Sequence, residues 1–236
     1  MKFAYLIEPP FNFRDGDGLI TGCDVELAEH VFLELGVSPF EPVETEFSEL
    51  LPGVSAGRWQ MTTGLFETEE RRETASFSRP IWALPDGLLV KRDNPLQIQG
   101  YRSIAKNSLC VLAVIRDQFQ HRSAVEFAIP ANRIAIFETY NEAAIAVRDG
   151  LADAYASVGR AHSGFMRQFP DWALEIVEVP ASEKAPAYGS FAFSLTDTSF
   201  RNDVDGVLER YLGSPDHRKM MGKYGFTDAE IDLLIS

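Results

Sequence analysis

The chain has 236 residues, of which 45% are hydrophobic, and it carries a formal net charge of −13. This hydrophobic fraction can build one large core or two small ones, and it excludes a disordered chain. Asp and Glu outnumber Lys and Arg, which argues against a nucleic-acid partner, and no apolar run reaches the roughly 18 residues that a membrane-spanning helix needs.

The amino terminus, Met1–Ile7, is predicted to enter a strand at once, which leaves no room for the regions of a signal peptide; either a signal has been removed or the protein never had one. From there, short apolar strands alternate with helical patterns. The predicted strands are 2–8, 59–66, 109–115, 133–138, 152–158 and 174–179, and the predicted helices are 24–35, 69–76, 118–127, 140–149 and 160–168. This alternation indicates βαβ units with mostly parallel sheets, so the expected fold class is α/β.

Signatures of metal and nucleotide chemistry are missing from the sequence. The four histidines are scattered without metal-ligand spacing, and there is no glycine-rich dinucleotide turn, phosphate loop or serine elbow. The two cysteines, Cys23 and Cys110, are interpreted as small buried apolar residues. We therefore expect no metal, no cofactor and no catalytic residue.

Two stretches resemble crossings between halves of the molecule. Prolines and glycine interrupt an extended segment at 80–87, and a polar, proline-containing segment follows at 180–189. If the chain crosses out and back there, residues 1–84 and 187–236 form one lobe and 85–186 form the other. The second lobe holds 11 basic and 12 acidic residues, which leaves 11 and 23 for the first, so the first carries a charge of −12 against −1.

The most informative segment is 57–73, a strand that runs into a helix capped by Thr68. Arg71 and Arg72 fall in the first helical turn, where the helix dipole disfavours cations by roughly 1 kcal/mol or less unless an anion is near. Neighbouring glutamates could supply that anion on the surface. Alternatively, one of the two arginines serves a ligand.

Several segments together resemble the family of periplasmic solute-binding proteins for polar amino acids, which have the type 2 periplasmic binding protein fold. The resemblance spans the whole chain and includes a "T-x-x-R" turn at Thr68–Arg71. The other matching segments are 9–11, 18–28, 47–52, 77–80, 150–154 and 223–226.

This resemblance implies two α/β lobes, joined by two hinge crossings, that close on a ligand in the cleft between them. By position, Arg71 would pair with a ligand carboxylate in a bidentate manner that lysine could not reproduce. Thr63 and Gly64 would add a hydroxyl and a backbone N–H to the same group.

Departures from the family pattern bear on the ligand. Glu8 stands where the family usually has a stacking aromatic ring, and Phe66 where a serine or threonine is usual. In the second lobe, Asp117-Gln118 replaces the "G-T" that grips the carboxylate. After Ser157, Val158 replaces the aspartate that holds the α-ammonium, so that clamp is missing while the arginine remains.

Each departure also has a simpler structural interpretation. Glu8 could be a solvated charge at a strand end, Phe66 a core residue and Asp117 the N-cap of helix 118–127. Trp82, at the first crossing, could be a structural aromatic residue. In the binding interpretation, Phe11, Phe66 and Trp82 are apolar walls, and Glu8 or Asp117 supplies the negative charge that Val158 lacks. Gln118 and Ser157 are the other expected ligand-binding residues of the second lobe.

The resemblance therefore implies a monomeric, periplasmic receptor that delivers a small carboxylate or zwitterion to an ABC permease. Because the ammonium clamp is absent, we expect a ligand other than a standard α-amino acid. Two alternatives remain at this point: an enzyme of the cyclohexadienyl dehydratase type, and a sensor module on the same fold, for which a cytoplasmic location is also open.

Overall fold

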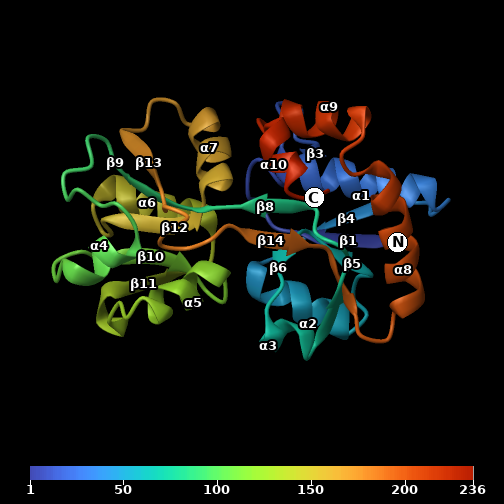
Figure 1. The fold of residues 1–236 in the computed structure, drawn as a ribbon, viewed down its shortest axis with the longest axis horizontal. Coiled ribbons are helices and arrows are strands. Elements are labelled where there is room, and N and C mark those ends of the chain that lie inside the picture. Colours follow the sequence, from blue (N-terminus) through green and yellow to red (C-terminus); the bar gives the residue numbers. More distant parts are fainter. Residues whose placement is uncertain (236) are drawn as a thin grey trace. The chain divides into compact units, whose positions relative to one another are not determined.

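The computed structural model describes residues 1–235, which divide into two compact units. Unit 1 consists of Met1–Ala83 and Tyr188–Ser236, and unit 2 consists of Leu84–Ala187. The chain thus leaves unit 1 after Ala83 and returns to it after Ala187. Each unit has its own strands and helices (Figure 1).

Unit 2 is built on a five-stranded sheet with the strand order β11-β10-β12-β9-β13. The strands are β9 (Asp86–Lys91), β10 (Leu112–Ile115), β11 (Ile134–Phe137), β12 (Ala154–Val158) and β13 (Leu174–Glu178). Its helices are α4 (Tyr101–Lys106), α5 (Phe119–Glu126), α6 (Tyr140–Asp149) and α7 (Gly159–Gln168), with a short 3-10 turn, η2, at Ala131–Arg133.

The pairing in this sheet is mixed. β10 runs parallel to β11 and to β12, whereas β9 runs antiparallel to β12 and to β13. The expectation of a mostly parallel sheet overlooked β9. This strand comes directly from the crossing rather than through a strand–helix–strand unit, so its direction is not fixed by a crossover helix.

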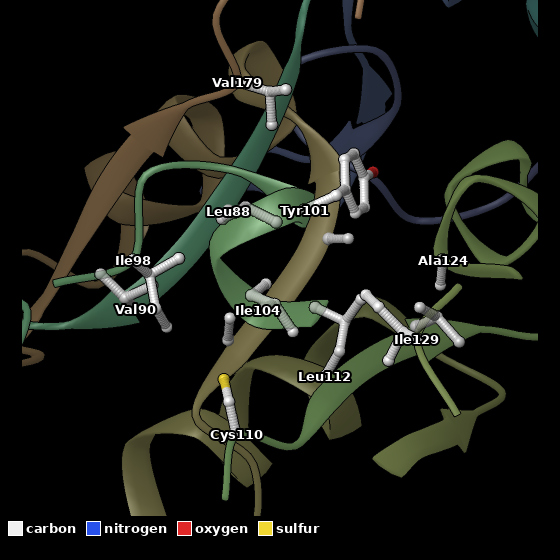
Figure 2. Close-up of a cluster of buried hydrophobic side chains, with 13 residues drawn as sticks. Leu88, Val90, Ile98, Tyr101, Ile104, Cys110, Leu112, Ala124, Ile129 and Val179 are labelled. Atoms are coloured by element: carbon white, nitrogen blue, oxygen red, sulfur yellow. The ribbon is translucent and has the colours of Figure 1, made fainter. Parts of the chain in front are cut away.

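The two faces of this sheet are covered by different helices, as the alternation along β12 shows. Ala154 and Ala156 belong to a buried cluster with residues of β9, β10, α4 and α5 (Figure 2). Tyr155 points to the other face, where its ring lies 4.9 Å from that of Tyr140 and 5.2 Å from that of His162. Side chains alternate between faces along a strand, so both faces of the sheet are apolar and buried.

Unit 1 contains several smaller sheets. A parallel sheet has the order β4-β1-β5, and its strands are β4 (Glu41–Glu44), β1 (Lys2–Tyr5) and β5 (Met61–Thr62). A second sheet, β6-β14-β8, joins β6 (Leu65–Phe66) to the two crossing strands β14 (Ala187–Ser190) and β8 (Trp82–Leu84). Two antiparallel pairs complete the set: β7 (Ala75–Phe77) with β15 (Ala192–Ser194), and β2 (Phe13–Arg14) with β3 (Ile20–Thr21).

The helices of unit 1 pack on both sides of these strands. They are α1 (Cys23–Glu34), α2 (Leu50–Ser55), α3 (Glu69–Arg72), α8 (Thr198–Tyr211), α9 (Pro215–Lys223) and α10 (Asp228–Asp232), with a 3-10 turn, η1, at Phe47–Glu49. Leu50 and Val54 of α2 share one buried cluster with Ala4 and Leu65. Elsewhere in the unit, Phe32 of α1 stacks on Phe200 of α8 with ring centroids 5.9 Å apart.

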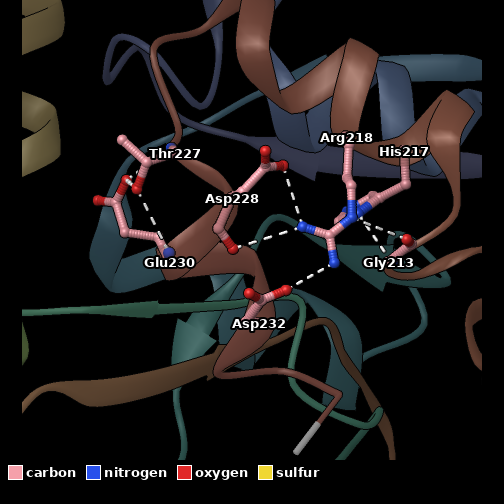
Figure 3. Close-up of polar contacts among 7 residues, drawn as sticks. All are labelled: Gly213, His217, Arg218, Thr227, Asp228, Glu230 and Asp232. Atoms are coloured by element: carbon pink, nitrogen blue, oxygen red, sulfur yellow. Dashed lines mark hydrogen bonds and ion pairs between the residues drawn. The ribbon is translucent and has the colours of Figure 1, made fainter.

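A polar clamp ties the last helices of unit 1 together (Figure 3). Arg218 of α9 donates to Asp232 Oδ1 at 2.6 Å, to Asp228 Oδ1 at 3.0 Å and to the Gly213 carbonyl at 3.0 Å. Because both carboxylates are largely exposed, this clamp contributes little stability and mainly fixes the position of α10.

Three predicted elements differ from the structure. The strand 59–66 is broken into β5 and β6 at Thr63-Gly64, and the strand 2–8 ends at Tyr5 before a tight turn. The helix 69–76 ends at Arg72, because Ala75–Phe77 pairs with β15 instead. Both cysteines are buried and free, as predicted.

Candidate functional site

A buried carboxylate, Asp24, organises the polar part of unit 1. It lies in the first turn of α1 with 1% of its surface exposed. Its Oδ2 accepts hydrogen bonds from the Thr63 hydroxyl at 2.5 Å and from the Gly64 N–H at 2.8 Å, and its Oδ1 accepts one from Trp82 Nε1 at 3.1 Å. A negative charge is also favoured at the start of a helix.

Two opposing effects act on this carboxyl group. Burial raises the pKa of Asp24, and the hydrogen bonds from Thr63, Gly64 and Trp82 partly oppose that rise, because they stabilise the ionised form. Asp24 is therefore an acceptor that ties two distant segments, Thr63-Gly64 and the strand with Trp82, to the start of α1.

The loop after β1 packs on the start of α1 beside Asp24. The Asp24 N–H donates to the Phe11 carbonyl at 3.1 Å, and Asn12 Nδ2 donates to Thr63 Oγ1 at 2.8 Å. Gly22 makes this approach possible: its φ is +132°, and a Cβ there would lie 2.0 Å from the Phe11 carbonyl oxygen.

An aromatic group stands next to this polar hub. The Trp82 indole is held against two glycines, since a Cβ on Gly64 would lie 2.7 Å from the ring and one on Gly189 only 2.0 Å from it. Phe66 meets the indole edge-on with centroids 5.2 Å apart, and Phe11 lies 5.3 Å from it. These close contacts and the bond to Asp24 fix the indole in one orientation.

Arg71 is positioned by its own turn. Its backbone N–H donates to the Thr68 hydroxyl at 3.2 Å, which caps α3, and its Nη1 donates to the Phe66 carbonyl at 2.7 Å. The guanidinium also lies over the Phe47 ring, 5.3 Å from the centroid. These contacts fix the orientation of the planar guanidinium.

The neighbouring Arg72 has a different environment. Its side chain is 63% exposed, and its Nε pairs with Glu67 Oε1 at 2.7 Å. The two arginines thus differ in their surroundings: Arg72 pairs with Glu67 at the surface, and Arg71 is half-buried, donates to the Phe66 carbonyl and lies over the Phe47 ring.

Glu8 begins the tight turn that carries Phe11. The Glu8 carbonyl accepts from the Phe11 N–H at 2.9 Å and from the Asn12 N–H at 3.2 Å, and the Glu8 N–H donates to the Asn12 carbonyl at 2.9 Å. Its side chain is half-buried. The turn thus links Glu8 to the loop that packs on Asp24.

In unit 2, three of the predicted site residues lie at the carboxyl ends of neighbouring strands. β10 pairs with β12 in parallel, and Asp117-Gln118 follows β10 while Ser157 lies near the end of β12. Parallel α/β sheets bind ligands at this edge. Gln118 is 4% exposed and its Oε1 has no hydrogen-bond partner in the structure.

The N-cap assignments at this edge differ from one of the sequence interpretations. Gln118, not Asp117, is the N-cap of α5, and it makes no side-chain capping bond. Asp117 is exposed and adopts a φ of +61°, a left-handed conformation that Asp tolerates better than most residues. Val158 is buried and is the N-cap of α7.

The predicted site residues thus fall into two sets, one in each unit. Unit 1 brings together Glu8, Phe11, Thr63, Gly64, Phe66, Arg71 and Trp82, and unit 2 holds Asp117, Gln118 and Ser157. The donors of Thr63 and Gly64 point to Asp24 in this structure, so a direct bond from either to a ligand would require exchange of that bond.

Sequence reasoning missed Asp24 and Gly189. Asp24 was part of a matching motif, but its role depends on Thr63 and Trp82, which are far away in the chain. A charged residue in the first turn of a helix, just before the apolar stripe, is a signal that could have drawn attention to it. No local pattern marks Gly189 as a neighbour of Trp82.

The part of the chain that the structure describes contains no helix long and apolar enough to cross a membrane. Within the same residues, no group of three or more His, Cys, Asp or Glu side chains is placed to hold a metal ion.

Comparison with known proteins identifies the family. Residues 2–227 match the family of bacterial extracellular solute-binding proteins, family 3. The chain belongs to this family. The predicted family and the two-lobed α/β fold are thereby confirmed, as is its association with amino-acid ABC transport.

Two curated relatives match nearly the whole of this chain and about three quarters of their own length. A probable amino-acid ABC transporter periplasmic-binding protein of Sinorhizobium fredii is 25% identical over 98% of this chain and 78% of its own. The arginine-binding protein ArgT of Corynebacterium glutamicum is 27% identical over 95% of this chain and 73% of its own.

Two solved structures are similar throughout. EhuB in complex with hydroxyectoine is 26% identical, with a TM-score of 0.88 over 98% of this chain and 90% of EhuB. The ancestral amino-acid-binding protein AncCDT-1, a precursor of cyclohexadienyl dehydratase, is 25% identical, with a TM-score of 0.81 over 95% of this chain and 94% of its own.

Proposed function

We propose that this family 3 protein is a transport receptor whose two lobes close on a small carboxylate-containing solute and deliver it to an ABC permease. The ligand is a carboxylate with an apolar or weakly basic body rather than a standard α-amino acid. The observation that carries the proposal is the oriented guanidinium of Arg71 next to the aromatic residues of unit 1.

The assignment of donors in unit 1 supports this ligand class. The Thr63 hydroxyl and the Gly64 N–H donate to Asp24 in this structure. We therefore assign recognition of the ligand carboxylate to the guanidinium of Arg71. Phe66 lies on the same short segment and contributes its carbonyl to Arg71 and its ring to Trp82. A carboxylate with an apolar body matches this combination of one charged donor and several rings.

The environment of an α-ammonium argues against ordinary amino acids. Burying an ammonium group without a carboxylate or several hydrogen-bond acceptors beside it costs on the order of several kcal/mol of binding free energy. Val158, at the position where the family resemblance implies an aspartate, cannot compensate for that loss. If the ligand body carries a cation, Glu8 or Asp117 is its partner.

The relatives support a zwitterionic solute of this kind. EhuB was solved with hydroxyectoine, and the similarity to EhuB covers nearly all of this chain. ArgT is named as an arginine-binding protein, so a cationic amino acid is the alternative ligand within the same transport function.

The test is a thermal-shift and calorimetric screen of the twenty standard amino acids beside hydroxyectoine-like zwitterions, opine-like compounds and small organic acids. Stabilisation grows with ligand concentration relative to Kd, so micromolar binders are visible at millimolar concentration. We expect the largest shift from a non-standard carboxylate. Tight binding of a standard α-amino acid would contradict the ligand class while leaving the transport role intact.

A second candidate is a dehydratase acting on cyclohexadienyl acids, which the likeness to AncCDT-1 supports. That protein is itself described as amino-acid-binding, and this chain offers no assigned general acid. Incubation of the protein with cyclohexadienyl acids, followed by detection of aromatic product, separates the two functions: turnover indicates the enzyme, and binding without turnover indicates the receptor.

A further inference from the structure

Unit 2 contains a buried carboxylate that the family resemblance did not bring to attention. Asp86, the first residue of β9, follows the crossing into unit 2 and is 3% exposed. It accepts hydrogen bonds from the Tyr101 hydroxyl at 2.7 Å, from Gln120 Nε2 at 2.8 Å and from the ammonium of Lys184. The Tyr101 ring lies at the edge of the aliphatic cluster with its hydroxyl directed away from it (Figure 2).

Lys184 reaches Asp86 from the other crossing segment. It precedes the return to unit 1 by a few residues, and its side chain is 13% exposed. Its ammonium also donates to Ser123 Oγ at 2.7 Å and lies 4.1 Å from the centre of the Phe119 ring. Burial lowers the pKa of Lys184, and the charge of Asp86 opposes that shift, so the ammonium depends on its partner.

Three of these partners lie on one helix. Phe119, Gln120 and Ser123 are all among the first five residues of α5, whose N-cap is Gln118. The Asp86–Lys184 pair therefore connects both crossing segments to α5, the helix that follows Asp117-Gln118. All of these contacts lie within unit 2.

The backbone around Asp86 is fixed as well. The Pro85 carbonyl accepts from the Gly159 N–H at 3.2 Å, the Asp86 carbonyl from the Val179 N–H at 2.9 Å and the Gly87 carbonyl from His162 Nε2 at 3.1 Å. Three consecutive residues after the crossing are thus anchored. The Asp86 side chain therefore connects this anchored stretch of backbone to Gln120 of α5.

Fold stability alone does not require such a pair. A buried ion pair is often no better for stability than apolar residues of similar volume, because both charges lose their hydration. Its distinguishing property is geometric, since a charged pair with further hydrogen bonds permits one arrangement where an apolar contact permits several.

We propose that Asp86 and Lys184 are positioning residues. They hold the start of α5, and with it Asp117 and Gln118, in a fixed position relative to both crossing segments. Ligand affinity then depends on a pair of residues that does not touch the ligand. The inference rests on the proposed binding function of this chain. It names a determinant of affinity outside the set of residues that contact the solute.

The test uses Lys184→Met, Asp86→Asn and the double variant, with Lys184→Arg as the conservative change and Arg148→Met as the control. Arg148 pairs with Asp149 at the surface and lies 4.5 Å from the centre of the Trp172 ring, so it controls for the loss of a charged side chain elsewhere in unit 2. Two quantities are measured: the Kd for the ligand that gives the largest shift in the screen, and hydrogen exchange of the ligand-free protein over residues 116–124 and the rest of unit 2.

We expect Lys184→Met to weaken binding by about ten-fold or more and to speed exchange selectively over residues 116–124. Lys184→Arg should keep most of the wild-type affinity, and Arg148→Met should bind as tightly as the wild type. The double variant should bind no more weakly than the weaker of the two single variants. A variant that is less stable yet keeps wild-type affinity and wild-type exchange over 116–124 would overturn the proposal. The exchange measurement needs no ligand, so it still decides the positioning role if the screen finds no binder.

Discussion

Asp24 is the residue on which the geometry of the unit 1 site depends most. Its carboxylate receives donors from the break between β5 and β6 and from the first crossing strand. Without it, the Thr63 hydroxyl, the Gly64 N–H and the Trp82 indole N–H would be buried donors with no acceptor.

We expect Asp24→Ala to lower the free energy of unfolding by about 3 kcal/mol or more, because each stranded buried donor costs about 1–3 kcal/mol and rearrangement recovers only part of this. Glu29→Ala, on an exposed position of the same helix, is the matched control and should change it by less than about 0.5 kcal/mol. Chemical denaturation measures both. Equal stabilities of the two variants would show that Asp24 is not the hub described here.

His162 gives the fold a defined response to acid. It is fully buried, its Nδ1 is paired with the Tyr140 hydroxyl and its Nε2 with the Gly87 carbonyl, and burial lowers its pKa to about 4. The unfolded chain therefore takes up this proton at a higher pH than the folded protein does. The contribution of neutral, buried His162 to the free energy of unfolding is fully present above pH about 6.5 and is lost as the pH falls through about 4.

The expected loss from this residue is roughly 3 kcal/mol across that range, to an order of magnitude. The free energy of unfolding is measured at several pH values for wild type and His162→Gln, and its slope against pH should differ between the two by close to one proton within the window. Parallel curves for wild type and His162→Gln would rule out this role for His162.

At the scale of elements, the crossing strands β8 and β14 depend on the absence of a side chain at Gly189. A Cβ there would lie 2.0 Å from the Trp82 ring, and the ring cannot retreat while Asp24 and Phe66 hold it. The close approach of the two strands around a flat indole is thus specified by glycine.

Gly189→Ala should therefore destabilise the protein by about 1–3 kcal/mol, as overpacking of a filled interior does, and should alter the fluorescence of Trp82. Gly222→Ala, in α9 with open space around the position, should be neutral or stabilising by up to about 1 kcal/mol. Thermal unfolding of the two variants checks this. A Gly189→Ala protein as stable as Gly222→Ala would contradict the packing of Trp82.

Sequence patterns predicted those elements whose signals are local. Helix 140–149 has the same bounds as α6, because Thr139 and Glu142 form a capping box and Gly150 supplies a left-handed C-cap. Residues 75 and 76 belong to the predicted helix 69–76 but form part of β7 in the structure, because their strand partner, β15, is far away in the chain. Propensity within a short window cannot reveal such a partner.

The same distinction applies to the candidate site. The turn from Thr68 to Arg71 could be recognised from four residues, whereas the roles of Asp24 and of the Asp86–Lys184 pair could not. Asp86 and Lys184 are separated by 98 positions, and only the fold of unit 2 brings them together. Family resemblance indicated where ligand residues are expected, but it did not indicate which polar groups already have partners within each unit.

At the scale of the whole molecule, the two units share one family fold but differ in charge and in the chemistry they offer. Met1–Ala83 with Tyr188–Ser236 carries 11 basic and 23 acidic residues, or −12, while Leu84–Ala187 carries 11 and 12, or −1. Unit 1 nevertheless supplies the proposed anion-binding cation, Arg71. A single oriented guanidinium in an acidic unit favours ligands that combine a carboxylate with a compensating positive or apolar body.

If Arg71 holds the carboxylate of the ligand, its removal must weaken binding. The most direct test is calorimetric titration of the ligand with the largest thermal shift into wild type, Arg71→Met and Arg72→Met. Arg72 is the matched control, because it lies on the same turn and pairs with Glu67 at the surface. We predict that Arg71→Met loses at least about 100-fold in affinity, since removing one partner of a buried charge pair costs about 2–5 kcal/mol, while Arg72→Met binds within about two-fold of wild type. Wild-type affinity in Arg71→Met, with both variants folded, would contradict the account.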